Sequence, residues 1–386
     1  LVQAARQWWK KFVKILIHIG FEMSKADPCL LTRRNKNGIV FIGLYVDDCL
    51  CIGHDKAIEE VIKLLKENGL KLKTEDKLVD YLSCEVIFNN ARDEAWLGQP
   101  HLIENLRKTF GEDVKEMQSY KTPGTPGYGI IRNVSDDQRL SKDDQKKYRT
   151  GVGMLLYLVK HSRPDIAISV RELSKVIDRP AIAGKKEMMR VIKYVLDSEN
   201  RGLSIKPMKG EEKWILHVYS DSDFAGDTEK RISVAGFVLY VLGVAVSWRS
   251  KGERSVTLFS TEAEYVALSE AVKEIKFVYQ ILVSINIEVE LPIIVRVDNI
   301  GAIYLSENAT ASGRTKHVNT RYHFVREYVE GKFIKIIFVR SEDNDSDIFT
   351  KNTSGELHEK HTAKMIGERE KVSMTTGRVS ESVVIE

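Results

Sequence analysis

The order of apolar segments after Trp214 constrains the fold more than any other feature of this chain. A group of strand-length apolar runs precedes a long helical pattern that begins at STEAEY, and further strands, helices and a final short helix follow it. The strand-like runs cover 214–220, 232–242, 244–248, 255–259, 293–297 and 333–339, and the final helix covers 346–351. Antiparallel strands that lead into alternating helices and strands predict an α/β domain over 211–352.

Three aspartates stand at the ends of these elements. Asp221 ends the first strand in ILHVYSD, Asp298 ends the strand IIVRVD just before a helix, and Asp347 opens the last helix within DNDSDIFTK. A fourth carboxylate has to be chosen between Glu262 and Glu264 in STEAEYVALSEAVKEI.

Helical spacing favours Glu264 as the inward carboxylate. The face that contains Glu264 carries an apolar stripe, which is expected to face the sheet, made of Leu268, Ala271, Ile275, Val278 and Leu282. The face that contains Glu262 is mainly solvated and carries Val266, Ser269, Lys273, Lys276 and Gln280. Glu264 has a competing structural role, because Thr261 and Glu264 also fit a capping box at the start of the helix. Judged from this segment alone, capping is favoured over a catalytic role for Glu264.

Taken together, Asp221, Glu264, Asp298 and Asp347 favour a metal site. Such a cluster holds two Mg²⁺ ions about 3.5–4 Å apart, of which one activates water and the other stabilises the leaving oxygen of a phosphodiester. Mg²⁺ suits this role because it prefers a few carboxylates together with water and substrate phosphate. The predicted cofactor is therefore Mg²⁺, or Mn²⁺ in its place.

A second pair of carboxylates, Asp47 and Asp48, lies in the most apolar run of the first hundred residues, GIVFIGLYVDDCLCIG. The pattern predicts two buried strands joined by a tight turn, with the Asp pair at its tip. Two adjacent ionised carboxylates among buried strands are costly, and a divalent cation would offset both burial and repulsion. A surface turn capped by Asp explains the spacing equally well.

The composition is that of an ordinary soluble globular protein, with 43% hydrophobic and 30% charged residues, and no apolar run is long enough to predict a membrane span. The four cysteines, Cys29, Cys49, Cys51 and Cys84, form no CxxC pair, so we expect buried thiols in a reducing compartment, either the cytoplasm or the nucleus. The net charge of +4 permits a polyanionic partner without requiring one.

The remaining chain divides at two loop-like segments. Residues 121–129 (KTPGTPGYG) form the first candidate linker and residues 206–213 the second, while 143–200 is predicted to be mostly helical with a break at SRPDIA. Upstream, we expect a helix at 56–68 and a strand pair near 71–74 and 84–89. The polar tail after Lys351 is predicted to be disordered.

At this point the motifs resemble a known family. SDSDFAGD, SVAGFVLYVLGVAVSWRSK, STEAEYVALSEAVKE, TKHVNTRYHFVRE and DIFTK resemble, in order and spacing, the ribonuclease H domain of copia-type retrotransposon polyproteins. ARQWWKKF, ADPCLL, LYVDDCLCIG, YLSCEV and RPDIAISV are similar to the reverse transcriptase of the same family. The resemblance covers residues 1–352.

The resemblance implies an α/β and α+β multidomain chain. Its parts would be a truncated polymerase palm (1–98), a helical thumb and connection (99–210) and a ribonuclease H-like α/β domain (211–352), followed by a disordered tail (353–386). It implies that Asp221, Glu264, Asp298 and Asp347 are the metal ligands of an RNA-cleaving site, and that Asp47 and Asp48 are two of the polymerase's metal ligands. The resemblance therefore favours cation binding by Asp47 and Asp48 over a role in the turn alone.

The chain departs from the family at three places. The third polymerase aspartate would lie upstream of Leu1, because the only earlier acidic residues are Glu22 and Asp27; the chain reads as cut into mid-domain, and we predict that residues 1–386 alone do not polymerise DNA. Phe259 replaces a serine usual in the family. Asp343 and Asp345 add negative charge near Asp347, which we expect to weaken or misplace metal binding.

The basic helix TKHVNTRYHFVRE carries candidate nucleic-acid contacts. Two interpretations are open for its histidines: one could shuttle a proton during product release, or both could contact phosphate beside the neighbouring cations. Phosphate contact is favoured, and the predicted binding residues are Arg314, Lys316, His317, Arg321 and His323.

The sequence thus predicts metal-dependent hydrolysis of the RNA strand in an RNA–DNA hybrid, with the basic helices of the middle region holding the hybrid. The missing upstream polyprotein segments would be further partners, and no membrane is expected. The alternatives are a catalytically inactive nucleic-acid-binding remnant of a retroelement and a nuclease of the same fold that cuts DNA.

Overall fold

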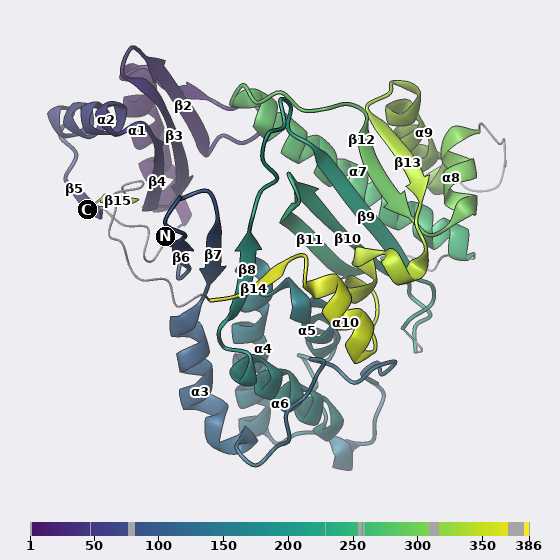
Figure 1. Ribbon diagram of the computed structural model, residues 1–386. Helices are drawn as coiled ribbons and strands as arrows, with labels where there is room; N and C mark the ends of the chain where they lie inside the picture. Colours follow the sequence, from purple (N-terminus) through teal and green to yellow (C-terminus); the bar gives the residue numbers. More distant parts are fainter. Residues whose placement is uncertain are drawn as a thin grey trace. The chain divides into compact units, whose positions relative to one another are not determined.

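The computed structural model describes residues 2–46, 48–75, 82–227, 229–253, 257, 259–308, 316–369 and 382–385 (Figure 1). The chain forms two compact units. The first comprises Leu1–Val86, Phe277–Glu288 and Val372–Glu386, and the second comprises Ile87–Lys276 and Val289–Lys371. In the described part of the chain, no helix has the length and apolar character needed to cross a membrane.

The first unit is a six-stranded sheet in the order β1-β2-β3-β4-β15-β5. Phe12 and Leu16 of α1, Leu31 and Ile42 of the sheet, and Val61 of α2 share its core. Its elements are α1 (Val2–His18), β1 (Glu22–Met23), β2 (Leu30–Asn35), β3 (Gly38–Tyr45), β4 (Asp48–Gly53), α2 (Asp55–Glu67), β5 (Leu72–Glu75) and β15 (Ser382–Ile385).

The predicted hairpin around the Asp pair is confirmed, because β3 and β4 pair antiparallel from Val40 opposite Gly53 to Tyr45 opposite Asp48. The predicted pairing of 71–74 with 84–89 is wrong. β5 instead pairs with β15, which lies between β4 and β5, so a strand from the chain end supplies the hydrogen bonds that β5 needs. Cys49, Cys51 and Cys84 are buried, and Cys29 is half-buried.

The second unit contains a helical layer with its own core. Leu106 and Phe110 of α3, Tyr148 and Leu155 of α4, and Ile192 of α6 lie in this core. The helices are α3 (Pro100–Val114), η1 (Asp136–Gln138), α4 (Lys142–His161), η2 (Pro164–Ile166), α5 (Ala167–Ser174) and α6 (Ile182–Asp197). The prediction of a mostly helical 143–200 with a break at SRPDIA is confirmed.

A five-stranded sheet in the order β11-β10-β9-β12-β13 forms the centre of the second unit (Figure 1). β9, β10 and β11 pair antiparallel, whereas β12 runs parallel to both β9 and β13. This order, with antiparallel strands followed by parallel strands and helices, confirms the predicted α/β sheet. Its elements are β9 (Leu216–Asp223), β10 (Val234–Val241), β11 (Val244–Gly252), α7 (Ser260–Ser284), β12 (Ile293–Val297), α8 (Ile300–Glu307), α9 (Lys316–Glu330), β13 (Ile334–Phe338), η3 (Ser341–Asp343) and η4 (Asp345–Phe349). Most of the strand predicted at 255–259 lies outside the described residues.

The disordered tail predicted from residue 353 is wrong for its first part. Residues 355–368 form α10 (Gly355–Thr362) and β14 (Ile366–Glu368), and β14 pairs antiparallel with β8. The segment folds because Met365 and the two histidines, His358 and His361, are buried. β14 belongs to a sheet in the order β14-β8-β7-β6, with β6 (Glu85–Phe88), β7 (Ala95–Gly98) and β8 (Arg201–Ile205).

The helical layer and the five-stranded sheet share one core. Ala167 of α5, Val238 and Tyr240 of β10, and Phe349 of η4 pack in the same cluster as Met365. The Trp248 indole donates to the Val159 carbonyl across 2.8 Å, so β11 is tied directly to α4. The predicted boundary at residue 210 therefore does not separate two compact units.

Candidate metal centre

Three carboxylates from three elements converge at one end of the five-stranded sheet. Asp221 comes from β9, Glu264 from the start of α7, and Asp298 from the residue after β12; one oxygen of each lies within 4.8 Å of the others. β9 and β12 are adjacent and parallel, so their carboxyl ends meet at the same edge. Asp221 and Glu264 are buried and Asp298 is half-buried.

Asp347 joins this cluster from η4, which packs against β9 and β10. Its carboxyl group lies near enough to that of Asp221 for the two charges to interact, and the Lys351 ammonium lies 3.0 Å from Oδ2 of Asp347. The Thr350 hydroxyl donates to Asp221. All four predicted carboxylates therefore lie in one place, and the Lys351 cation faces them.

Burial dominates the electrostatics of the cluster. It raises the pKa of Glu264 to about 10, with the charges of Asp221 and Asp298 adding to the effect. It raises the pKa of Asp347 to about 7, with the charge of Asp221 as the next cause. The pKa of Asp221 is raised by burial as well, and Lys351 opposes all three shifts. Without further positive charge, the cluster binds protons in place of a cation.

The residues present fit a divalent metal ion. Oε2 of Glu264 and Oδ1 of Asp347 are buried and have no hydrogen-bond partner among the described residues. A buried carboxylate oxygen without a partner costs about 1–3 kcal/mol, which a cation would offset. Carboxylate oxygens are the hard ligands that Mg²⁺ and Mn²⁺ accept.

Glu264 rather than Glu262 is the inward carboxylate, as the spacing predicted. Glu264 is 6% exposed, and it accepts a hydrogen bond from the Ser222 backbone N–H, whereas Glu262 is half-buried. The competing capping box does not form, because α7 begins at Ser260 and Thr261 is already a helical residue. One detail of the predicted solvated face differs, since Val266 and Ser269 on it are buried.

Comparison with known proteins relates the chain to a family. Residues 1–111 match the family described as reverse transcriptase (RNA-dependent DNA polymerase). The Retrovirus-related Pol polyprotein from transposon TNT 1-94 of Nicotiana tabacum is 30% identical over 354 residues, which are 91% of this chain and 26% of that protein. Over nine-tenths of its length, this chain is related to Pol polyproteins of copia-type transposons. It spans about a quarter of the length of the transposon Pol polyproteins from Nicotiana tabacum and Arabidopsis thaliana that it matches.

Two further similarities cover parts of this chain. The secreted RxLR effector protein 161 of Plasmopara viticola is 42% identical over 127 residues, which are 33% of this chain and 87% of that protein. LC11-RNase H1, whose crystal structure was solved in complex with an RNA/DNA hybrid, is 16% identical; the match covers 35% of this chain and 93% of that chain, with a TM-score of 0.27.

Asp343 and Asp345, which were expected to disturb the metal site, each have partners of their own, and their effect on metal binding stays a prediction. Asp345 is fully buried and accepts hydrogen bonds from Tyr240 at 3.1 Å, from His361 at 3.0 Å and from Lys364 at 2.9 Å. The Lys360 ammonium lies 2.7 Å from Asp343. Both carboxylates are neutralised by α10 and the residues after it, which the sequence predicted to be disordered.

The predicted polymerase ligands of the chain are described only in part. Asp47 lies outside the described residues. Asp48 is half-buried and begins β4 opposite Tyr45. Their role as metal ligands and the absence of polymerisation by residues 1–386 stay predictions.

The predicted nucleic-acid contacts on the basic helix are likewise only partly described. Arg314 lies outside the described residues, and Lys316, His317 and Arg321 belong to α9 with their side chains outside the description. His323 is exposed on α9. The structure brings none of them into the carboxylate cluster within the residues it describes, so phosphate contact stays a prediction.

The basic side chains of α6 are less free to bind a hybrid than the sequence suggested. Lys185 lies 2.6 Å from Asp144, and Lys193 lies 2.5 Å from Asp197. Arg190 stacks over the ring of Tyr120 and donates to Thr122. Intramolecular partners therefore hold three of the four cations that made this helix a candidate, and of the four only Lys186 is exposed.

Three polar residues around the carboxylates were not predicted to belong to the site. Thr350 donates to Asp221, Ser341 donates to Asp298 at 2.6 Å, and Lys351 pairs with Asp347. Lys351 could have been found from its spacing, because residues four apart on a helical turn lie side by side. No sequence pattern indicated that Ser341 contacts Asp298, because this contact depends on how η3 folds back toward the end of β12.

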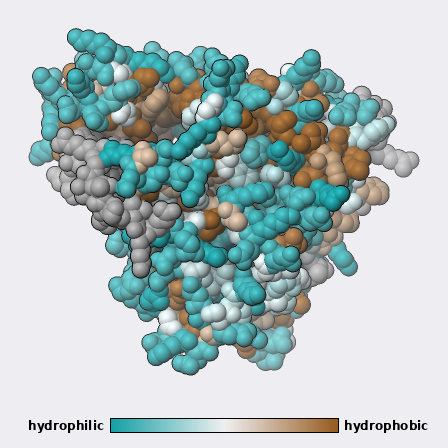
Figure 2. Space-filling view, in the orientation of Figure 1, coloured by the Kyte–Doolittle hydropathy of each residue, from teal (hydrophilic) through white to brown (hydrophobic). Residues whose placement is uncertain are grey.

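Hydrophobic side chains are exposed on the elements that carry the carboxylates. Phe259 before α7 is 70% exposed, and Ile300 and Tyr304 of α8 are 69% and 56% exposed. The two elements approach closely, since a Cβ on Gly301 would lie 2.9 Å from the Thr261 hydroxyl. Figure 2 shows hydrophobic residues gathered over the region of α7, α8 and β12. Exposed apolar side chains of this kind are typical of binding surfaces.

Proposed function

We propose that this chain hydrolyses the RNA strand of an RNA–DNA hybrid at the carboxylate cluster. The convergence of Asp221, Glu264 and Asp298 within 4.8 Å carries the proposal, since it provides the acidic oxygen ligands that phosphodiester hydrolysis with divalent metals requires. Similarity to a reverse-transcribing family supports RNA–DNA hybrid as the substrate, because reverse transcription produces it.

Mg²⁺ or Mn²⁺, when bound, would activate a water molecule and stabilise the leaving oxygen of the phosphodiester. Asp221, Glu264, Asp298 and Asp347 would hold it. The surrounding donors fix the directions of three of these carboxylates: Thr350 orients Asp221, Ser341 orients Asp298, and the Ser222 N–H orients Glu264. Lys351 orients Asp347 and partly neutralises the cluster.

The experiment is cleavage of a hybrid, labelled on its RNA strand, by the full chain with Mg²⁺ or Mn²⁺ and with EDTA. Asp298→Asn is expected to lower the rate by about 100-fold or more, because it removes one ligand charge. Asp137→Asn, which changes an exposed aspartate on η1, is the matched control and is expected to cleave at the wild-type rate.

The outcomes separate the alternatives. Metal-dependent loss of the RNA strand that Asp298→Asn abolishes supports the proposal. Hybrid binding without any metal-dependent product indicates the inactive nucleic-acid-binding remnant instead. Equal cutting of duplex DNA and hybrid indicates a nuclease with a different substrate.

A further inference from the structure

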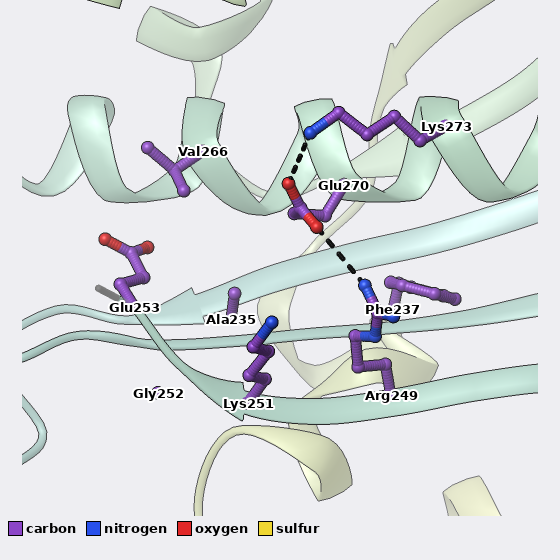
Figure 3. Close-up of a pocket in the computed structure, with 9 residues that line it drawn as sticks. All are labelled: Ala235, Phe237, Arg249, Lys251, Gly252, Glu253, Val266, Glu270 and Lys273. Carbon is purple, nitrogen blue, oxygen red and sulfur yellow. Dashed lines mark hydrogen bonds and ion pairs between the residues drawn. The ribbon is translucent and has the colours of Figure 1, made fainter. Parts of the chain in front are cut away.

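A second site lies on the same sheet as the carboxylates, between α7 and the strands β10 and β11. It is a pocket with a volume of about 310 Å³ (Figure 3). Phe237 and Val266 form part of its apolar wall. Its charged lining includes Arg249, Lys251, Glu270 and Lys273.

The cations of this pocket come from two elements and lie around one opening. Arg249 and Lys251 are two residues apart on β11, so both side chains leave the same face of the sheet. Lys273 comes from α7, and Figure 3 shows Lys251 pointing from β11 toward that helix. β11 is an edge strand of its sheet, so Arg249 and Lys251 lie at the sheet edge.

Glu270 holds two of the cations in place. Its carboxylate lies 3.2 Å from Arg249 and 2.6 Å from Lys273 (Figure 3). The Arg249 and Lys273 side chains are 42% and 53% exposed, and ion pairs at such exposure are weak because water screens them. Both cations are thus positioned in advance and still able to accept an anion.

The charges of the pocket leave an excess of positive charge. Arg249, Lys251 and Lys273 outnumber the two lining carboxylates, Glu253 and Glu270. Lys251 is exposed, and within the described ranges it forms no ion pair. The opposite holds at the carboxylate cluster, where, among the described residues, acidic side chains outnumber the cation Lys351.

The pocket borders the carboxylate cluster through the backbone. Ala235 lines the pocket and pairs across the sheet with Ser222, whose N–H donates to Glu264. Val266 lines the pocket from α7, two residues after Glu264. A nucleic-acid strand bound at the carboxylates would therefore lie beside the pocket.

We propose that this pocket binds a backbone phosphate of the nucleic acid whose phosphodiester reaches the carboxylates. The inference rests on the proposed function, since it names a further contact for the same substrate. A polyanion is repelled by the carboxylates, so binding needs cations beside them. Arg and Lys contacts to backbone phosphate position a nucleic acid without reading its sequence, and an Arg guanidinium matches phosphate geometry.

The test compares Lys251→Gln with Lys335→Gln in the full chain. Lys335 is an exposed lysine on β13, the opposite edge strand of the same sheet, and is therefore the matched control. The dissociation constant for a fluorescent RNA–DNA hybrid is measured in EDTA over a series of KCl concentrations, so that no cleavage takes place. Thermal melting of both variants verifies that the fold is unchanged, as expected for surface lysines.

Lys251→Gln is expected to weaken binding by about 3- to 10-fold at low salt and to reduce the slope of log K against log [KCl] by about 0.7–0.9, the contribution of one phosphate contact. Lys335→Gln is expected to change neither. Lys251→Glu should weaken binding further than Lys251→Gln. Equal affinities and slopes for wild type, Lys251→Gln and Lys335→Gln would overturn the inference.

Cleavage measured in parallel separates this inference from the proposed function. If the wild type cleaves hybrid and Lys251→Gln binds and cleaves it equally well, the pocket assignment is wrong and the nuclease stands. If the wild type does not cleave but its hybrid binding depends on Lys251, the nuclease is wrong and the pocket assignment stands.

Discussion

At the scale of single residues, the carboxylate cluster shows a conflict between stability and chemistry. Glu264 and Asp347 are buried next to Asp221, and each holds an oxygen without a hydrogen-bond partner among the described residues. Lys351 offsets only part of the repulsion, because the pKa values of Glu264 and Asp347 stay raised beside it. A site prepared for divalent cations is expected to destabilise the metal-free protein.

This conflict predicts a pH dependence that Asp347→Asn should reveal. The folded-state pKa of Asp347, about 7, lies above its ordinary value of 3.8, so between these values the folded protein binds a proton that the unfolded chain has released. Folding stability therefore falls as the pH rises through this window, and the loss is complete above the folded-state pKa. The amide that replaces this carboxyl group in the variant does not titrate, so the variant lacks this contribution.

In EDTA, Asp347→Asn is expected to raise the melting temperature by about 2 °C or more at about pH 8.5, and by less at about pH 5. Differential scanning calorimetry of the two chains at both pH values measures this. Saturating Mg²⁺ should reverse the order of the melting temperatures, because the wild type binds the ion more tightly. A stability difference that is independent of pH would contradict the assignment of Asp347 to the cluster.

At the scale of elements, the position of η4 depends on a glycine of β10. Gly236 lies opposite Asp221 in the sheet, and a Cβ at this position would be 2.7 Å from the Thr350 side chain and 2.9 Å from the Phe349 Cβ. Only a residue without a side chain lets η4 come this close to the strand. The close approach brings Asp347 to Asp221.

Gly236→Ala is accordingly expected to destabilise the chain by about 1–3 kcal/mol and to lower metal affinity, because η4 must move away from β10. Urea unfolding and a Mg²⁺ titration followed by melting temperature measure the two effects. Gly153→Ala in α4 is the matched control: a Cβ there meets nothing within 4 Å, so the change should stabilise the helix by about 0.5–1 kcal/mol. Equal stability of the two variants would show that η4 does not need Gly236.

The sequence predicted the elements better than their partners. The periodicity of α7 placed Glu264 inward, and the ends of β9 and β12 placed Asp221 and Asp298, because these depend on local patterns and on sheet topology. The contacts of Asp345 could not be predicted, since they come from Lys364 and His361 in a segment of polar composition. The pairing of β5 with β15 was missed because the two strands lie about 300 residues apart in the sequence.

At the scale of the whole molecule, the predicted nuclease region is not an independent folding unit. Its sheet shares a core with α5, and Trp248 donates to Val159 in α4. Asp345, buried within 211–352, takes its cation Lys364 and its hydrogen-bond partner His361 from residues after 352. A buried carboxylate that loses its partners costs about 3–5 kcal/mol, a large share of the stability of a domain.

Residues 211–352 expressed alone are therefore expected not to fold, although they contain all four carboxylates. The fragment would leave Asp345 uncompensated and expose the faces of β10 and β11 that α5 covers, so we expect broad, non-cooperative melting and binding of a hydrophobic dye. Residues 87–371, which retain α4, α5, α10 and β14, should melt cooperatively. Calorimetry of the two fragments beside the full chain makes the comparison. Cooperative melting of 211–352 would mean that the sheet is stable without the helical layer, and that the contacts of Trp248 and Asp345 contribute little to it.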